Sequence, residues 1–138
     1  VQNIGDGPCL PSHGREAIPS GHMQGKSNPP PVVVCVKCGT KYPADYANRL
    51  HRMARRHLSA GHRFLCLTDD ADGLDSDIDA RPLPGRDLGG CWNKLWLFSD
   101  ELAPAGTTLL YLDLDVVVVD SLDGLLECSP EESFLGQP

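Results

Sequence analysis

The chain has 138 residues and a formal net charge of −7 at pH 7, with 41% hydrophobic and 22% charged residues. This length allows one domain with a modest core, and the negative charge argues against nucleic acid as the main partner. Because no apolar stretch is long enough to span a bilayer, the sequence predicts a soluble, cytoplasmic protein without a transmembrane segment.

The first segment, residues 1–31, contains five Gly and six Pro but no hydrophobic period. Such a segment buries too little apolar surface to offset its ordering entropy, which predicts a disordered tail. The folded domain is expected at residues 32–138.

A predicted strand, loop and helix follow the tail. Residues 32–36, VVVCV, form a short apolar run that is typical of a buried strand. Residues 38–42 form a loop, and Pro43 suits the first position of a helix. Apolar side chains then recur at helical spacing over residues 44–58, until Gly61 ends the helix. This order is half of a βαβ unit.

The outer face of this predicted helix carries four arginines, Arg49, Arg52, Arg55 and Arg56. A basic amphipathic helix can bind a membrane surface or an anionic partner. A solvated charged face is commoner, and we interpret the arginines in that way.

Acidic residues follow the second predicted strand, residues 62–68. Asp69 and Asp70 come at its carboxyl end, where open parallel sheets bind ligands. The acidic run continues to Asp79, but it fits a calcium-binding loop poorly. Thr68 would be the first ligand, and strands rather than helices flank the run.

A short third strand is predicted over residues 78–83, and a helix over residues 91–98. Lys94 is the only charged residue of this helix. The simplest interpretation of Lys94 is that its aliphatic stem packs on apolar surface while its ammonium reaches solvent.

The chain is organised around residues 107–123, TTLLYLDLDVVVVDSLD. This run predicts a long buried strand, central in a sheet that is covered on both faces. Because side chains alternate along a strand, Asp113 and Asp115 would share one face, roughly 7 Å apart at the backbone. A last helix is expected to start near Ser121 and to run to Glu127.

Two unpaired carboxylates in such a strand would be costly to bury, and each would raise the pKa of the other. A divalent cation, Mn²⁺ or Mg²⁺, would remove this cost if Asp113 and Asp115 bind it together with water and phosphate oxygens. The alternative is that the strand is interrupted at Leu112. Both aspartates would then lie in a solvated turn, or pair with Lys and Arg elsewhere.

The cysteines are interpreted as reduced, because Cys35 and Cys66 lie inside apolar runs where a free thiol acts as a small hydrophobe. Cys35 and Cys38 have the spacing of a zinc or redox pair, but no second pair follows. The full set comprises Cys9, Cys35, Cys38, Cys66, Cys91 and Cys128.

The stretch CWNKLWLFSDELAPAGTTLLYLDLDVVVVDSLDGLLE resembles the nucleotide-sugar-binding half of glycosyltransferases of the A-type fold. The resemblance is to the glycogenin-like family 8 and its bacterial relatives. It includes VVVCVKCGTKYPADYANRL and FLCLTDD, and so covers residues 32–127. It implies an α/β fold, with a mostly parallel sheet and flanking helices, that forms the nucleotide-binding half of a nucleotide-diphospho-sugar transferase.

The resemblance also implies roles for individual residues. Asp113 and Asp115 match the Asp-x-Asp motif that binds Mn²⁺ or Mg²⁺ with the donor diphosphate, and Asp113 would also lie near the ribose. Lys94 matches a lysine that approaches the phosphate or the sugar. The loop from Lys37 to Tyr42 matches the nucleoside segment, with Tyr42 as a stacking partner for the base. Asp69 and Asp70 would lie near the base or ribose.

The donor implied is a nucleoside diphosphate sugar, in particular a UDP-sugar, and the acceptor is unknown. The sequence assigns no catalytic residue, since the acceptor half of such enzymes and its metal-binding His would follow Pro138. We therefore expect a truncated product or fragment that binds the donor weakly at most.

Two alternatives remain open at this stage. One is a non-catalytic interaction module that retains a half-fold, with a partner chain covering the truncated edge. The other is a metal-dependent phosphatase or nucleotidyltransferase, with Asp69 and Asp70 as the second acidic cluster.

Overall fold

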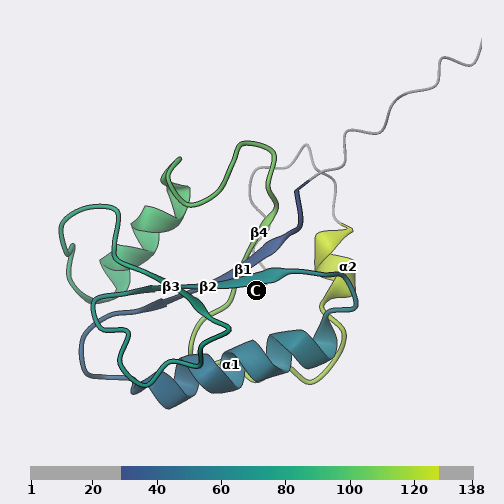
Figure 1. Cartoon of the computed structure of the whole chain (residues 1–138), viewed down its shortest axis with the longest axis horizontal. Helices are drawn as coiled ribbons and strands as arrows, with labels where there is room; N and C mark the ends of the chain where they lie inside the picture. The colour runs from purple at the N-terminus through teal and green to yellow at the C-terminus, as the bar shows by residue number, and fades with distance from the viewer. Residues whose placement is uncertain (1–28, 128–138) are drawn as a thin grey trace, which may run out of the picture.

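The computed structural model describes residues 29–127 of the chain (Figure 1). The predicted disordered tail therefore lies outside the described residues, apart from residues 29–31. Cys9 and Cys128 also lie outside them, as does the end of the predicted domain.

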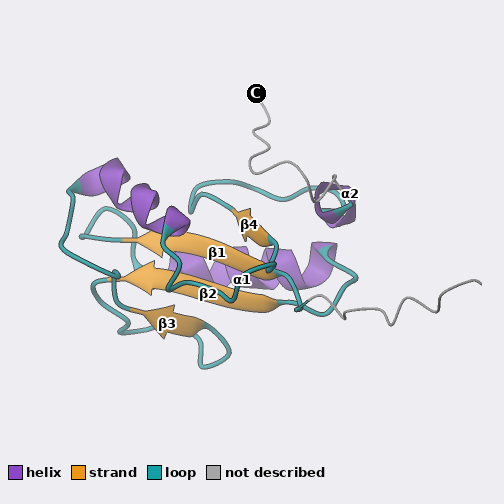
Figure 2. Ribbon diagram, turned by 90° about the horizontal axis from the view of Figure 1, so that it is seen from above, coloured by secondary structure: helices purple, strands orange, loops and turns teal. Residues whose placement is uncertain are grey.

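The strands form one four-stranded sheet in which every pairing is parallel (Figure 2). Its order is β3 (Asp79–Arg81), β2 (Arg63–Thr68), β1 (Val32–Lys37) and β4 (Leu109–Tyr111). Val32 of β1 is in register with Arg63 on one side and with Leu109 on the other. The predicted α/β class with a mostly parallel sheet is confirmed.

Helical elements cover both faces of the sheet (Figure 1). Helix α1 (Ala44–His57) packs on one face, where a core cluster includes Val33, Cys35 and Leu50. The 3₁₀ helix η1 (Gly90–Phe98) lies on the other face, where Trp96 and Leu97 pack against a second core cluster. Alternate residues of β1 and β2 enter the two clusters, as the period of an extended chain requires.

The ends of the first three elements lie close to the predicted positions. Strand β1 continues to Lys37, and β2 begins at Arg63. Pro43 precedes the first helical residue, because its backbone is extended, with ψ at 165°. Leu58, rather than Gly61, caps the carboxyl end of α1, and its amide donates a hydrogen bond to the carbonyl of Ala54 at 2.9 Å.

Strand β3 is shorter than the predicted residues 78–83. It ends at Arg81, immediately before Pro82. Proline has no backbone N–H to donate to a neighbouring strand, which explains why the pairing stops there.

The prediction of a long central strand over residues 107–123 is wrong. Only Leu109–Tyr111 forms a strand, and β4 lies at the edge of the sheet beside β1. The amide of Leu112 still donates to the carbonyl of Val34 at 3.0 Å, after which the chain turns, with the amide of Val116 donating to the carbonyl of Asp113. Asp113 and Asp115 therefore do not alternate along an extended strand.

The physical reason is that both carboxylates have hydrogen-bond donors away from the sheet. Asp113 accepts from Lys94 and from the amide of Leu114, and Asp115 accepts from Tyr42. The interrupted strand and the solvated turn, which the sequence allowed as an alternative, are what the structure shows.

The last helix, α2 (Asp123–Leu126), is also shorter than predicted. It is anchored beside the end of α1, because the amide of Leu122 donates to the carbonyl of His57 at 2.8 Å. The carboxylate of Asp123 also accepts from the amide of Ser59 at 2.9 Å. In the part of the chain that the structure describes, no helix has the length and apolar character needed to cross a membrane.

Candidate functional site

The carboxyl ends of the parallel strands bring together most of the predicted site residues. Strands β1, β2 and β4 run in the same direction, so the loops that follow Lys37, Thr68 and Tyr111 leave the same edge of the sheet (Figure 2). Ligands of open α/β sheets bind at this edge.

Lys94 and Asp113 form an ion pair at this edge. The Lys94 ammonium lies 2.5 Å from Oδ2 of Asp113, and both side chains are about two-fifths exposed. The hydrogen bond to Asp113 raises the pKa of Lys94 above its ordinary value. Burial opposes ionisation of Asp113, but the bond and charge of Lys94 outweigh it and lower the pKa of that carboxyl.

Asp115 is held by a tyrosine from the loop after β1. The Tyr42 hydroxyl donates to Oδ2 of Asp115 at 2.8 Å. The Tyr42 ring lies 5.0 Å from that of Tyr46, measured between centroids, and the ammonium of Lys41 lies 4.7 Å from the Tyr42 centroid. A nucleoside base that stacks on the Tyr42 ring would therefore lie beside Tyr46 and Lys41, which already contact this ring.

The remaining predicted residues hold the loops of this edge together. Lys37 is only 4% exposed, and its ammonium donates to the carbonyl of Asp70 at 3.0 Å. The Asp69 carboxylate accepts from the amide of Gly39 at 2.8 Å, where a φ of 71° favours glycine. In the structure, Lys37 is buried and connects the loops after β1 and β2, whereas Asp69 and Asp70 take part in the same connection but remain exposed to solvent.

Asn93, a buried asparagine next to Lys94, was not predicted as a site residue. Asn93 is fully buried, and its amide donates to the carboxylate of Asp87 at 2.7 Å and accepts from the amide of Leu88 at 2.9 Å. These bonds attach η1 to the loop before it. The sequence did contain one signal for this role, because Asn93 is a polar residue next to Lys94, the only charged residue of an apolar helix.

Tyr111, the last residue of β4, is a second residue without a predicted role at this site. The Lys94 ammonium lies 5.6 Å from the centre of its ring. Burial raises the pKa of Tyr111 to about 12, so its hydroxyl remains protonated at neutral pH. The Tyr111 ring therefore provides apolar surface beside the ion pair of Lys94 and Asp113.

The donor set fits a cation that takes only part of its ligands from protein. Among residues 29–127, no group of three or more His, Cys, Asp or Glu side chains could hold a metal ion. Asp113 and Asp115 provide two carboxylates on one turn, which suits Mg²⁺ or Mn²⁺ with the remaining positions given to water and phosphate. Such a set does not suit structural zinc.

The cysteine pair does not supply a metal site either. Cys35, Cys38, Cys66 and Cys91 are free thiols. Cys35 is buried in the core, and burial together with the charge of Asp69 raises the pKa of Cys38 to about 11. A protonated thiol is a poor metal ligand.

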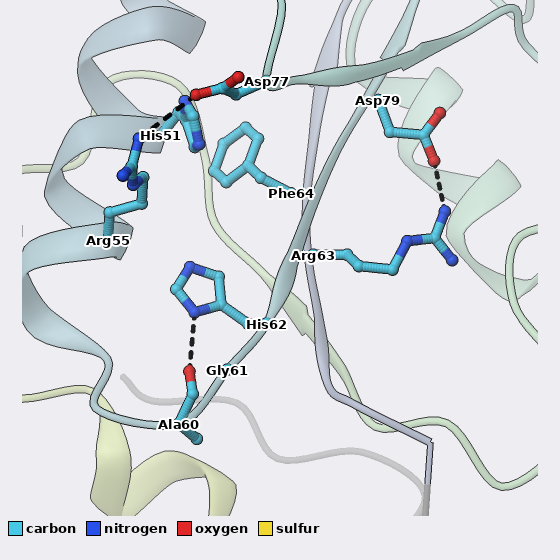
Figure 3. Close-up of a pocket in the computed structure, with 9 residues that line it drawn as sticks. All are labelled: His51, Arg55, Ala60, Gly61, His62, Arg63, Phe64, Asp77 and Asp79. Atoms are coloured by element: carbon cyan, nitrogen blue, oxygen red, sulfur yellow. Dashed lines mark hydrogen bonds and ion pairs between the residues drawn. The ribbon is translucent and has the colours of Figure 1, made fainter.

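A depression of about 580 Å³ lies at the opposite edge, at the amino ends of β2 and β3 (Figure 3). Arg63 pairs with Asp79 at 2.6 Å, Arg55 pairs with Asp77 at 3.4 Å, and the His51 ring packs 5.0 Å from that of Phe64. None of the predicted site residues lines it. Its charges are paired with one another, so we favour the carboxyl edge as the functional site despite the size of this depression.

A second hollow, of about 370 Å³, includes Asp115. It lies between α1 and the turn after β4, and Arg49, Arg52 and Arg56 line its α1 side. Arg49 pairs with Asp45 at 2.5 Å and Arg52 with Asp75 at 3.0 Å. These exposed pairs agree with the interpretation of a solvated charged face.

Comparison with known proteins adds no relative. No protein-family model matches the sequence, and no curated protein or solved structure matches it either. The class that fold and site define is an α/β protein with two carboxylates and a lysine at the carboxyl edge of a parallel sheet.

Proposed function

We propose that the chain is the donor-binding part of a glycosyltransferase and binds a nucleoside diphosphate sugar, in particular a UDP-sugar, together with Mn²⁺ or Mg²⁺. The observation that carries this proposal is the contact between Lys94 and Asp113 beside Asp115. Segments 19 residues apart contribute one cation and two carboxylates to the edge of the sheet where ligands bind.

The chemistry of these groups suits a diphosphate. Carboxylates bind a divalent cation, and the cation neutralises charge that develops on a leaving diphosphate. Lys94 supplies a second positive charge at the same place. Tyr42 would contact the nucleoside, with the loop from Lys37 to Tyr42 as its support.

The test is calorimetric titration of UDP into the protein with and without Mn²⁺. We expect binding that requires Mn²⁺ and that is lost in Asp115→Ala. Asp100→Ala is the matched control, because Asp100 is an exposed carboxylate outside this edge. The proposal fails if folded wild-type protein does not bind UDP, or if the two variants bind it equally well.

A non-catalytic interaction module is the second candidate. It is favoured by large apolar side chains that solvent reaches, namely Trp92, Leu95, Phe98, Val117 and Val119. Exposed apolar surface of this kind often marks a protein interface. Folded protein that binds no UDP would support this candidate.

The phosphatase or nucleotidyltransferase alternative gains no support. It needs Asp69 and Asp70 as a second reactive acidic cluster. Asp69 accepts from the amide of Gly39 instead, and a carboxylate oxygen of Asp70 accepts from the amide of Asp72 at 2.9 Å. These bonds give each carboxylate a partner within the loops, which does not favour a role as a reactive acid.

A further inference from the structure

We infer that Lys94 and Tyr42 compete with the divalent cation for Asp113 and Asp115, so that cation and diphosphate bind together rather than separately. This inference rests on the proposed function and adds to it a rule for how the site fills. Its basis is the set of hydrogen bonds that each carboxylate accepts.

Both Asp113 oxygens accept hydrogen bonds. Oδ2 accepts from the Lys94 ammonium at 2.5 Å, and Oδ1 accepts from the amide of Leu114 at 3.1 Å. Oδ2 of Asp115 accepts from the Tyr42 hydroxyl at 2.8 Å. A cation that uses both Oδ2 atoms therefore competes with one ammonium and one hydroxyl for these oxygens.

The ammonium is the more important competitor because it is charged. An ammonium and a divalent cation on the same oxygen would repel each other strongly at such a short distance. Lys94 is on a flexible four-carbon stem, so its ammonium can leave Asp113. A diphosphate beside the site offers it a new anionic partner, which removes the cost of leaving the carboxylate unpaired.

Cation and diphosphate consequently favour each other's binding. The diphosphate draws Lys94 away from Asp113 and frees the oxygen for the cation, and the cation in turn favours the diphosphate. Such coupling is reciprocal by thermodynamic linkage. Without diphosphate, the pairing between Lys94 and Asp113 weakens binding of the cation.

Tyr42 extends this coupling to the loop after β1. Its hydroxyl bonds Asp115, while its ring contacts Tyr46 and Lys41. Displacing the hydroxyl frees the loop end to adjust to a nucleoside. Tyr42→Phe removes the hydroxyl and keeps the ring, so it isolates this bond.

The experiment measures Mn²⁺ binding from the electron paramagnetic resonance signal of the free ion, with and without UDP, after subtraction of the Mn²⁺ that UDP binds in the absence of protein. For the wild type we expect UDP to tighten Mn²⁺ binding by about tenfold or more. Lys94→Met should bind Mn²⁺ alone more tightly than the wild type, and UDP should tighten its Mn²⁺ binding less than it does in the wild type, because the contribution from Lys94 is absent. Tyr42→Phe should bind Mn²⁺ alone more tightly and keep the effect of UDP.

Lys41→Met is the control, because it removes a positive charge from the same edge without removing a hydrogen bond to either aspartate. Lys41 acts on both aspartates through its charge alone, so Lys41→Met should tighten Mn²⁺ binding much less than Lys94→Met does. Lys94→Gln keeps a polar end and guards against misfolding of Lys94→Met, and near-UV circular dichroism checks each variant.

The inference is overturned if the wild type binds Mn²⁺ and UDP but folded Lys94→Met and Lys94→Gln bind Mn²⁺ alone no more tightly than Lys41→Met. That result would leave the proposed donor site intact. If the folded wild type binds neither Mn²⁺ nor UDP, the proposed function fails and the inference fails with it.

Discussion

The Tyr42 hydroxyl donates a 2.8 Å hydrogen bond to Asp115, although 73 residues separate the two in the chain. Tyr42 is in the loop after β1, and Asp115 is in the turn after β4, and these strands are parallel neighbours. Parallel pairing places both carboxyl ends at one edge of the sheet. The bond therefore joins the first and last parts of the candidate site.

The buried histidine of α1 predicts how stability depends on pH. Burial and then the charge of Arg55 lower the pKa of His51, although Asp77 and Asp75 oppose this. The unfolded chain binds this proton more readily than the folded chain does. The stability that neutral His51 contributes is therefore fully present above about pH 6.5 and declines as the pH falls below that value. Urea unfolding across this range should show the decline.

His51→Leu should make the stability depend less on pH in this range, because it removes the buried titrating group. His62→Gln, which removes an imidazole at a partly exposed position, is the control. An unchanged pH profile in His51→Leu would show that other groups cause the decline.

The core on the α1 side should be sensitive to truncation at Leu50. Leu50 is fully buried against β1 and β2 residues of the same cluster. Leu50→Ala should lower the free energy of unfolding by about 2–5 kcal/mol, because it removes buried apolar contacts and leaves a cavity. Leu95→Ala, at a residue that is 54% exposed, should cost much less. Equal losses in the two variants would contradict this account of the core.

A glycine before η1 should be required for the packing of Trp96. A Cβ added at Gly85 would lie 2.6 Å from Cζ2 of the Trp96 indole, a rigid ring that cannot move aside cheaply. Gly85→Ala should shift the tryptophan fluorescence and lower the melting temperature. At Gly61 a Cβ would meet nothing within 4 Å, so Gly61→Ala should change neither; a silent Gly85→Ala would refute the predicted clash.

The described cysteines should differ in their reactivity with iodoacetamide. Cys91 is exposed, whereas burial and the charge of Asp69 raise the pKa of Cys38 to about 11. A hydrogen bond with Cys66 and burial raise the pKa of Cys35. Since the thiolate is the reactive form, peptide mapping of native protein at mildly alkaline pH should show Cys91 modified first.

Cys38 should react more slowly, and Cys35 and Cys66 should react only when urea unfolds the chain. Reaction of Cys38 as fast as that of Cys91 in native protein would contradict this order. Rapid reaction of Cys35 would show that the core opens more readily than its burial indicates.

The sequence by itself determined the order of the elements and the class of the fold. VVVCV and the apolar run before Asp69 have the length and composition of buried strands, and residues 44–58 have the period of a helix packed on them. These are local patterns, and a local pattern is sufficient because strand and helix periods differ. The same apolar run predicted that Asp69 and Asp70 follow β2.

Only the tertiary structure decided where β4 ends and what the charged residues contact. The run LLYLDLDVVVV has the composition of a strand along its whole length, but only its first three residues, Leu109–Tyr111, pair with β1. Beyond Tyr111, Lys94 and Tyr42 are available to Asp113 and Asp115, and they favour a turn. Hydrogen-bond partners far apart in the chain meet only in the folded state, so no local period could have predicted them.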